Sequence, residues 1–526
     1  MHTSINYLMA QAAWLAIAAA TGLAALAPAT AKPNNGIKTT ITNFDSKGAQ
    51  VTRFDTDGNA VDAHDGQIAF FEGVYYLYGT SYDCGFVWQK PNAPFCGFKC
   101  YSSTDLVHWK DLGFLFNAAT PEWQARCNGN TYGGYRPKVV YNASTHRYVM
   151  WFNAYDNSSG YHAFTSATPF GPFTPVADPV VAANKGVPPG LNNGDQALFV
   201  DDDGVGYIAY TDWRTGGGIV IERLTPDYLT GTGDYIRTTK TGTEAPSLFK
   251  RNGIYYLTYS DPNCGYCGGT GTSYMRAKSP LGDWEPGGKI SPDSAGGQPS
   301  FVEPIETKTG TVYLYGSDLW NNGARNEALA NFYWAPLSFA PDGSINQLTA
   351  ENTCTLALAV GAAGRQQKIA DLDRTGGVDG YRTHADIAGN IARSQSFVAG
   401  RTGILTSISY TTFQIGDPNA DLELAIYKAD TQHRPAGPAL FQTSIPAASV
   451  GWSARNVTVQ PNIPVSWSER YAIVVKSGTS SGAYGFAYND AHPYVEGVEC
   501  YSNDSGATWT VEKNRTAKFV TTVKKR

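Results

Sequence analysis

A short turn followed by a tyrosine-rich strand recurs five times in the first two thirds of this chain, and no other feature constrains its fold as tightly. Asp-Gly and Asn-Gly pairs in these turns favour tight hairpins, because both residues tolerate positive φ. A further short strand precedes each copy and others follow it, so each repeat predicts about four strands. The copies occupy residues 72–78, 145–151, 203–210, 252–259 and 309–315.

Five repeats at intervals of about 50 to 70 residues match the blades of a five-bladed β-propeller, which we place at residues 38–356. Such a fold gathers the first strand of every blade around one axis, so residues far apart in sequence meet there. The longest gap separates the first two copies and contains four cysteines and the aromatic residues 86–88. We expect this insertion to decorate the axial face.

The sequence changes character after residue 356, where the tyrosine-rich repeat stops and Ser, Thr, Val and Ala dominate. Apolar and polar residues alternate in several stretches, which is typical of strands with one buried face. We predict a linker at residues 361–380 and a jelly-roll-like β-sandwich at residues 394–526. The fold class expected for the whole chain is therefore all-β. The alternating stretches are residues 404–413, 422–427, 455–459 and 471–476.

The N-terminus has the pattern of a secretory signal. An apolar stretch at residues 12–27 precedes Ala29-Thr30-Ala31, which fits a small-x-small cleavage site. The first eleven residues contain no Lys or Arg, so the usual positive start is missing. We predict a signal peptide at residues 1–31 and a secreted protein, extracellular or periplasmic.

Eight cysteines agree with an oxidising destination, because they cluster in loop-like segments rich in Gly and Asn. Cys264 and Cys267 have the spacing of a redox motif, but no βαβ pattern surrounds them, so a disulfide that closes a loop is the better interpretation. Cys354 and Cys500 would tie the two predicted domains together if they paired. No His/Cys set has zinc spacing.

Three acidic residues open predicted first strands of different blades. They are Asp65 in blade one, Asp195 in blade three and Glu244 in blade four, and each precedes a tyrosine of its tyrosine-rich strand, at position 76, 207 or 256, by 11 or 12 residues. A single acid at a strand start commonly caps a turn. Three acids in matching register are harder to explain that way, so we predict that all three point into the axial pit. The C-terminal region offers no comparable set, and we expect it to bind polysaccharide or to brace the propeller.

These motifs resemble glycoside hydrolase family 43 over roughly residues 50–345. Asp65-x-x-Ile68 is similar to the strand of that family's general base, and Glu244-Ala245-Pro246 is similar to the strand of its general acid. The segment after Asp195 resembles that of the family's pKa-modulating aspartate. Further matches resemble the branch with exo-1,3-galactanases and some arabinofuranosidases, at residues 54–59, 102–106, 136–142, 318–320 and 333–337.

The resemblance implies an inverting, exo-acting enzyme that releases terminal furanose sugars. We expect α-L-arabinofuranose first and β-D-galactofuranose second, with exo-β-1,3-galactanase and β-xylosidase as alternatives. Galactanase relatives usually have Gly at the position of Asp65, so Asp65 favours the ordinary base mechanism. A carbohydrate-binding propeller without turnover is the alternative from another class, and the intact acid trio argues against it. In every case the expected partner is a polysaccharide or oligosaccharide.

Four further residues are expected to contact substrate: His64, Arg136, Gln298 and Trp320. Gln298 lies where many family members have a His near a central metal, so we expect no metal and no cofactor. The net charge of −5, without a basic stripe, argues against a nucleic acid partner. Aromatic residues reach 13 % of the chain, and their faces suit stacking on sugar rings. No membrane association is expected, and the chain is expected to act as a monomer.

Overall fold

The computed structural model confirms the all-β fold class, with strands throughout and, among the residues that it describes, one short α-helix, α1 (Pro121–Arg126), and three single-turn 3-10 helices. Residues 35–526 form one compact unit. The predicted signal peptide lies outside the described residues. In the described part of the chain no helix is long and apolar enough to cross a membrane. The described residues are 36–87, 93–126, 134–154, 157, 159–182, 193–239, 241–263, 268–320, 326–361 and 363–525.

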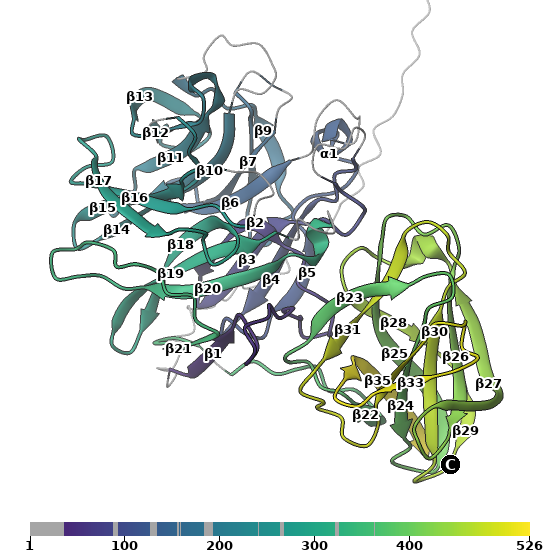
Figure 1. Ribbon diagram of the computed structural model, residues 1–526. Helices are drawn as coiled ribbons and strands as arrows, with labels where there is room; N and C mark the ends of the chain where they lie inside the picture. Colours follow the sequence, from purple (N-terminus) through teal and green to yellow (C-terminus); the bar gives the residue numbers. More distant parts are fainter. Residues whose placement is uncertain are drawn as a thin grey trace, which may run out of the picture. The chain divides into compact units, whose positions relative to one another are not determined.

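Five small antiparallel sheets follow one another along residues 64–337, which we call the five-sheet region (Figure 1). Within each sheet the strands neighbour one another in sequence order, and the tyrosine-rich repeat forms the second strand. The first two sheets are β2 (His64–Phe71), β3 (Val74–Thr80), β4 (Phe98–Ser103) and β5 (Lys110–Phe114), then β6 (Tyr135–Asn142), β7 (Arg147–Asn153), β8 (Tyr161–Ser166) and β9 (Thr174–Ala177). The third is β10 (Asn193–Val200), β11 (Gly206–Asp212), β12 (Gly218–Leu224) and β13 (Gly231–Arg237). The fourth is β14 (Glu244–Arg251), β15 (Ile254–Ser260), β16 (Thr272–Ala277) and β17 (Glu285–Ser291), and the fifth is β18 (Gln298–Thr307), β19 (Gly310–Leu319) and β20 (Asn331–Leu337).

The first strands of successive sheets contact one another. β2 contacts β6, β6 contacts β10, β10 contacts β14, β14 contacts β18, and β18 contacts β2. Residues at the starts of these five strands are therefore brought close together. Outside the five sheets, β1 (Lys38–Thr42) pairs with β21 (Thr353–Ala357), so the two ends of this part of the chain meet.

Buried aromatic side chains fill the spaces between neighbouring sheets. Trp151 of β7 and Tyr210 of β11 share one such cluster, and both are fully buried. Their polar atoms find partners: the Trp151 indole N–H donates to the carbonyl of Tyr228 at 2.8 Å. The Tyr78 hydroxyl of β3 likewise donates to the carbonyl of Pro169 at 2.6 Å. Tyr and Trp suit these wedges because each buries a large ring and keeps a polar group that can reach the backbone.

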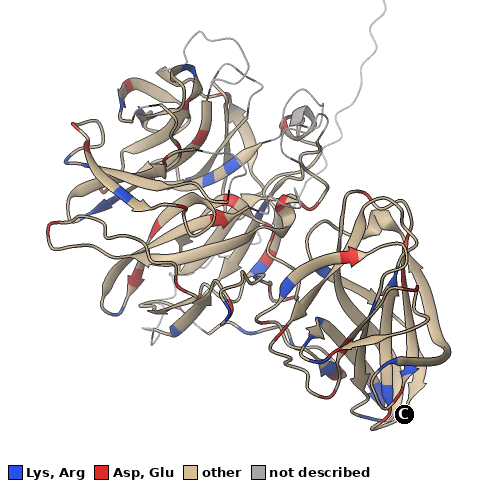
Figure 2. Ribbon diagram, in the orientation of Figure 1, with Lys and Arg blue, Asp and Glu red and all other residues tan. Residues whose placement is uncertain are grey.

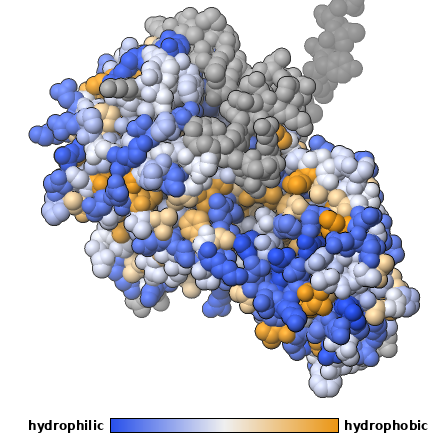
Figure 3. Space-filling view, in the orientation of Figure 1, coloured by the Kyte–Doolittle hydropathy of each residue, from blue (hydrophilic) through white to orange (hydrophobic). Residues whose placement is uncertain are grey.

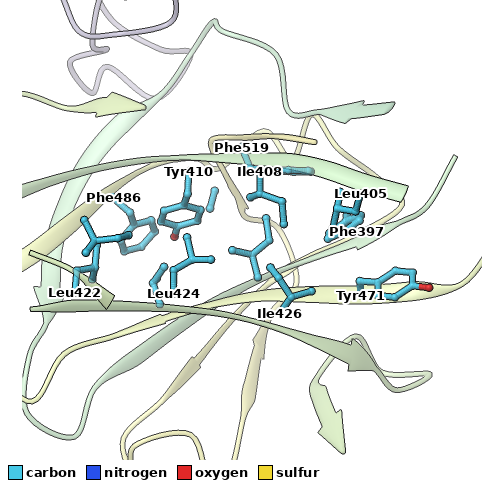
Figure 4. Close-up of a cluster of buried hydrophobic side chains, with 14 of the residues drawn as sticks. Phe397, Leu405, Ile408, Tyr410, Leu422, Leu424, Ile426, Tyr471, Phe486 and Phe519 are labelled. Atoms are coloured by element: carbon cyan, nitrogen blue, oxygen red, sulfur yellow. The ribbon is translucent and has the colours of Figure 1, made fainter. Parts of the chain in front are cut away.

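Two larger sheets make up residues 372–525, which we call the C-terminal region. An apolar cluster lies between strands of the two sheets and includes Phe397, Leu405, Ile408, Leu424 and Ile426 (Figure 4). On the visible surface of this region hydrophilic residues dominate, and Lys and Arg are interspersed with Asp and Glu (Figures 2 and 3).

One sheet has eight strands: β22 (Leu372–Thr375), β23 (Arg382–Ile387), β25 (Gly403–Ile415), β28 (Arg455–Val459), β29 (Ile463–Val465), β31 (Ala483–Asn489), β34 (Thr516–Ala517) and β35 (Phe519–Lys525). The other has six: β24 (Ala392–Val398), β26 (Leu422–Ala429), β27 (Pro435–Ile445), β30 (Arg470–Lys476), β32 (Glu499–Ser502) and β33 (Thr510–Glu512). The predicted alternating stretches fall on β25, β26, β28 and β30. β22 lies inside the predicted linker at residues 361–380, and β23 also precedes residue 394, so the linker prediction was wrong at β22. Both strands have little alternation of apolar and polar residues, and they are held by pairing with β35 and β31.

The cysteines correct one expectation. Cys84 and Cys96 form a disulfide, but Cys354 and Cys500 are buried free thiols and do not pair. The Cys354 thiol lies 3.4 Å from the carbonyl of Trp334, and the Cys500 thiol lies 3.7 Å from that of His433. Cys100 is also free, while Cys127, Cys264 and Cys267 lie outside the described residues.

Candidate active site

A β-bulge occurs near the start of the first strand in each of the five sheets. The pairing of β2, β6, β10 and β14 with the next strand shifts directly after their first paired residue. Three residues at these bulges have left-handed backbone angles: Asp65 (φ 54), Arg136 (φ 52) and Ala245 (φ 53). Such angles cost about 1–3 kcal/mol in a non-glycine residue and gather at functional sites. A bulge also bends its strand and redirects side chains, so these positions are shaped for a purpose other than sheet pairing.

The bulges show that the three predicted acids are not in matching register. Glu244 precedes its bulge and pairs with Ser260, whereas Asp65 is the first bulge residue of β2 and Asp195 the second of β10. Counting back from the tyrosine-rich strands concealed this offset, because the turn between β10 and β11 has five residues and the corresponding turns of the other two sheets have two. The prediction of equal register was therefore wrong, although the acids do converge.

Asp65 is held by three donors and is almost fully buried, with 3 % of its surface exposed. The Thr80 hydroxyl donates to its Oδ1 at 2.7 Å, and the backbone N–H of Arg136 donates to the same oxygen at 2.9 Å. The Tyr82 hydroxyl donates to Oδ2 at 2.7 Å. Burial raises the pKa of Asp65 to about 6, against the lowering effect of the Arg136 charge and the Tyr82 hydrogen bond. Asp65 is thus a carboxylate above about pH 6.

Arg136 joins the predicted residues into one network. Its Nε lies 2.7 Å from Oδ1 of Asp195, and its Nη2 donates to Oε1 of Gln298 at 2.9 Å. Its guanidinium is buried, and the charges of Asp195 and Asp65 outweigh the cost of burial, so its pKa is raised above the usual range. A permanently charged, planar group with several donors can hold two acceptors in fixed positions.

Glu244 completes the network from the fourth sheet. The side-chain amide of Gln298 donates to its Oε2 at 3.2 Å. Burial, and then the negative charge of Asp195, raise the pKa of Glu244 well above its ordinary value, although Arg136 and the Gln298 hydrogen bond oppose this shift. Glu244 is only partly buried by surface area, so a ligand can reach it. The arrangement supplies a protonated carboxyl near an ionised one.

Gln298 lies beside Glu244, and Trp320 lies beside Gln298. The Trp320 indole N–H donates to Oε1 of Gln298 at 3.2 Å. Because that oxygen also accepts from Arg136, the amide nitrogen of Gln298 is left to face Glu244. The structure therefore brings together six of the seven predicted site residues: Asp65, Asp195, Glu244, Arg136, Gln298 and Trp320.

His64 is placed differently from the expected pocket wall. Its side chain has no exposed surface and stacks between the rings of Tyr82 and Phe332, with centroids 5.6 and 5.1 Å away. Its Nε2 lies 3.4 Å from Asp62, and its Nδ1 lies 3.8 Å from Asp318. Burial lowers the pKa of His64, but the two carboxylates outweigh it and raise the pKa to about 9. His64 is a buried cation behind Asp65, without a surface to offer a sugar.

Sequence reasoning missed the residues that support the acids. Thr80 and Tyr82 hold Asp65. Thr80 ends β3 and pairs with His64, and Tyr82 follows two residues later. Lys138, 1 % exposed, donates to the carbonyls of Gly66 and Ser300 and so ties three sheets together beside the bulges. Only the motif Arg136-Pro137-Lys138 could have indicated Lys138, and nothing in a single sequence shows where its side chain goes.

The described residues contain no group of three or more His, Cys, Asp or Glu side chains placed to hold a metal ion. The acidic turn at residues 201–203 instead contacts Lys250, whose Nζ lies 2.7 Å from Asp201 and 2.8 Å from Asp202. This ion pair accounts for the acidic run without a bound cation.

Known proteins with similar sequences match this chain mainly in the five-sheet region. The sequence model of glycosyl hydrolases family 43 matches residues 59–337. A β-D-galactofuranosidase of Aspergillus niger is 30 % identical over 223 residues, which are 41 % of this chain and 62 % of the relative. A non-reducing end α-L-arabinofuranosidase of Bacteroides ovatus is 30 % identical over 200 residues, which are 36 % of this chain and 34 % of the relative. The match thus spans less than two thirds of either relative.

Among solved structures, an exo-β-1,3-galactanase of Clostridium thermocellum is similar with a TM-score of 0.51 and 27 % sequence identity. The similarity covers 64 % of this chain and 70 % of that protein.

Proposed function

Because the chain belongs to glycosyl hydrolases family 43, we propose that it is an inverting exo-glycoside hydrolase with Glu244 as general acid and Asp65 as general base. One observation carries this proposal: the pKa of Glu244 is raised well above that of an ordinary carboxyl, whereas Asp65 ionises at about pH 6, and one Arg136 network joins them. Two carboxyl groups whose pKa values lie apart can act as acid and as base at one pH.

In the proposed reaction Glu244 gives its proton to the glycosidic oxygen as the bond from that oxygen to the anomeric carbon breaks. Asp65 takes a proton from a water molecule, whose oxygen forms the new bond on the opposite face of the sugar. The configuration of the anomeric carbon is thereby inverted. Asp195 keeps Glu244 protonated through its charge and fixes the Arg136 guanidinium. Gln298 and Trp320 are proposed to contact the sugar.

For the substrate we propose a terminal α-L-arabinofuranose, with β-D-galactofuranose as the second candidate, on a polysaccharide or oligosaccharide. The names of the two curated relatives support these sugars. The similarity to an exo-β-1,3-galactanase supports the alternative of a terminal β-1,3-linked galactose. The presence of Asp65, in place of the Gly that resemblance to galactanases would imply, favours the furanosidase.

For the architecture we propose a five-bladed propeller at residues 38–356, with an accessory β-sandwich at residues 394–526 extended by β22 and β23. The successive contacts among first strands, including that of β18 with β2, support the propeller. The two apolar-cored sheets support the sandwich. We further propose that residues 1–31 direct secretion, which the disulfide between Cys84 and Cys96 favours.

The test is hydrolysis of nitrophenyl α-L-arabinofuranoside, β-D-galactofuranoside, β-D-xyloside and β-D-galactopyranoside, with NMR of the first product. We expect turnover of a furanoside and an inverted anomer. A retained anomer would contradict the assignment of Asp65 as base. Turnover of the galactopyranoside alone would favour the galactanase, and binding of oligosaccharides without any hydrolysis would favour a non-catalytic role.

A further inference from the structure

One wall of the candidate site is formed by the segment after β3, at residues 81–87. Its Tyr82 donates to Oδ2 of Asp65, and its ring packs against Phe86 and Trp320 with centroids 5.0 and 6.0 Å away. Tyr82 thus links this wall to the proposed base, Asp65. Whatever fixes this segment also fixes one oxygen of Asp65.

The same segment is held from the C-terminal region, by residues 450–456. The backbone N–H of Ser453 donates to Oδ1 of Asp83 at 2.6 Å, and the guanidinium of Arg455 forms an ion pair with the Asp83 carboxylate. Asp83 directly follows Tyr82 in the chain. Its side chain is largely buried, at 9 % exposure, so this pair is screened less by solvent than an exposed one.

The Trp452 side chain, from residues 450–456, packs against the segment at residues 81–87. It is 7 % exposed and belongs to one apolar cluster with Tyr82, Phe86 and Tyr135. Gly85 packs directly on its indole, where a Cβ would lie only 3.0 Å from the ring, and has a positive φ of 91°. On the far side, the side-chain amide of Asn326 donates to the carbonyl of Trp452 at 3.1 Å. The indole is therefore fixed both at its ring and at its backbone.

We propose that Trp452, together with the pairing of Asp83 and Arg455, positions Tyr82 and through it the Asp65 carboxylate, so that the C-terminal region completes the active site. Trp452 touches none of the three acids and is a positioning residue. The inference rests on the proposed function of Asp65. It argues against the simpler expectation that the C-terminal region only binds polymer.

Other contacts hold the C-terminal region in place without involving residues 450–456. The Lys518 ammonium donates to the carbonyl of Gly58 at 2.7 Å. The backbone N–H of Thr52 donates to the carbonyl of Tyr381 at 2.8 Å. Loss of the Trp452 ring should therefore loosen the wall without detaching the region.

The experiment is Trp452→Ala in the full-length protein, with kcat/KM measured against pH on the small nitrophenyl glycoside that the unsubstituted enzyme cleaves. We expect kcat/KM to fall by about 10- to 100-fold, because small misplacements of a catalytic group are costly. The acidic limb of the profile should also move to higher pH, since the Tyr82 hydrogen bond lowers the pKa of Asp65. Trp467→Ala is the matched control, because that Trp is 69 % exposed.

A double-mutant cycle separates positioning from general loosening. Tyr82→Phe should produce the same shift of the acidic limb, and Trp452→Ala added to Tyr82→Phe should shift it no further. Additive shifts, or an unchanged profile in Trp452→Ala, would overturn the proposal. If Trp452→Ala does not fold, Asp83→Asn removes the ion pair with little change of shape and should move the limb in the same direction.

A readout without turnover distinguishes this inference from the proposed function. Carbon-13 NMR of labelled aspartate, assigned by comparison with Asp65→Asn, follows the ionisation of Asp65 directly. If the unsubstituted protein cleaves no glycoside, the proposed function fails, but a raised Asp65 pKa in Trp452→Ala would still support the positioning. An unchanged Asp65 pKa would overturn the positioning even in an active enzyme.

Discussion

Both regions of the molecule bury carboxylates, but they pair them differently. In the C-terminal region Asp386 and Glu499 share two guanidiniums: Arg393 lies 2.8 Å from Glu499 and also contacts Asp386, and Arg515 lies 3.7 Å from Glu499. In the five-sheet region the Arg136 guanidinium pairs with Asp195, the Arg136 backbone N–H donates to Asp65, and Glu244 is linked to Arg136 only through Gln298.

Glu499 and Glu244 differ in exposure and in the charges near them, and this difference distinguishes the candidate site. Burial raises the pKa of Glu499 to about 7, so a raised pKa alone does not distinguish it from Glu244. Glu499 has no exposed surface and two guanidiniums near it, whereas Glu244 is partly exposed and lies near Asp195, whose negative charge raises the pKa of Glu244 further. We infer that an accessible carboxyl next to a second carboxylate indicates catalysis, while a carboxylate paired with cations in a closed interior indicates architecture.

The largest effect is expected from Asp65→Asn. Loss of the carboxylate removes the proposed acceptor of the water proton, so kcat/KM should fall by about 10² to 10⁴-fold on every substrate, whatever its leaving group. Glu499→Gln is the matched change in the C-terminal region and should leave kcat/KM unaltered. Steady-state kinetics on two nitrophenyl glycosides measure both. Full activity of Asp65→Asn would instead indicate that Gln298 handles the water.

Arg393→Met should destabilise the protein by about 3–5 kcal/mol, because it leaves the buried Glu499 without its closest cation while keeping an apolar stem. The raised pKa of Glu499 sets the sign of the pH dependence. Its protonated form stabilises the fold, and this stability is lost as pH rises through about 7 in the unsubstituted protein and through a higher value in the variant. Denaturation curves should therefore show a larger deficit at pH 8 than at pH 5. An equal deficit at both values would show that Glu499 is not the group left unpaired.

Glu244→Gln removes the proposed proton donor with little change of shape. Turnover of natural linkages should fall by about 10²-fold or more, and turnover of substrates with very good leaving groups should fall less, because these need little protonation. Paired kinetics on an oligosaccharide and on a dinitrophenyl glycoside give the comparison. Equal losses on both would contradict the role of Glu244.

The smallest change expected is in the pH profile of the unsubstituted enzyme. Asp65 must be ionised, so kcat/KM should decline below about pH 6. Glu244 must be protonated, so kcat/KM should also decline on the alkaline side, once pH exceeds the raised pKa of that carboxyl. Glu244→Gln should lack the alkaline limb and keep the acidic one. A profile that stays flat below pH 6 would contradict the assignment of Asp65.

The sequence was sufficient to predict the hairpins and to place the three acids near the starts of first strands. Turn pairs and tyrosine-rich strands are local signals, which is why the second strand of every sheet was placed correctly. Family motifs identified Asp65, Asp195 and Glu244 because those residues carry the motifs themselves.

Contacts between sheets could not be predicted in the same way. The burial of His64 depends on Phe332, more than 260 residues away, and the hydrogen bond from Tyr82 to Asp65 depends on a bulge that has no sequence signature. The free thiols of Cys354 and Cys500 likewise follow from neighbours that only the fold supplies. The alternation of apolar and polar residues predicts which residues share a face of a strand, but it does not predict which residues pack against that face.

The left-handed backbone at Asp65 bears on how such enzymes change over evolutionary time. Glycine adopts that conformation without the cost of about 1–3 kcal/mol that other residues bear, so a mutation from Asp to Gly at this position would relax the chain as it removed the base. The same mutation would leave the hydrogen-bond donors of Thr80, Tyr82 and Arg136 without their acceptor, and this loss opposes the gain in backbone energy. A lineage that acquired another way to handle the water would be free to accept the more comfortable glycine.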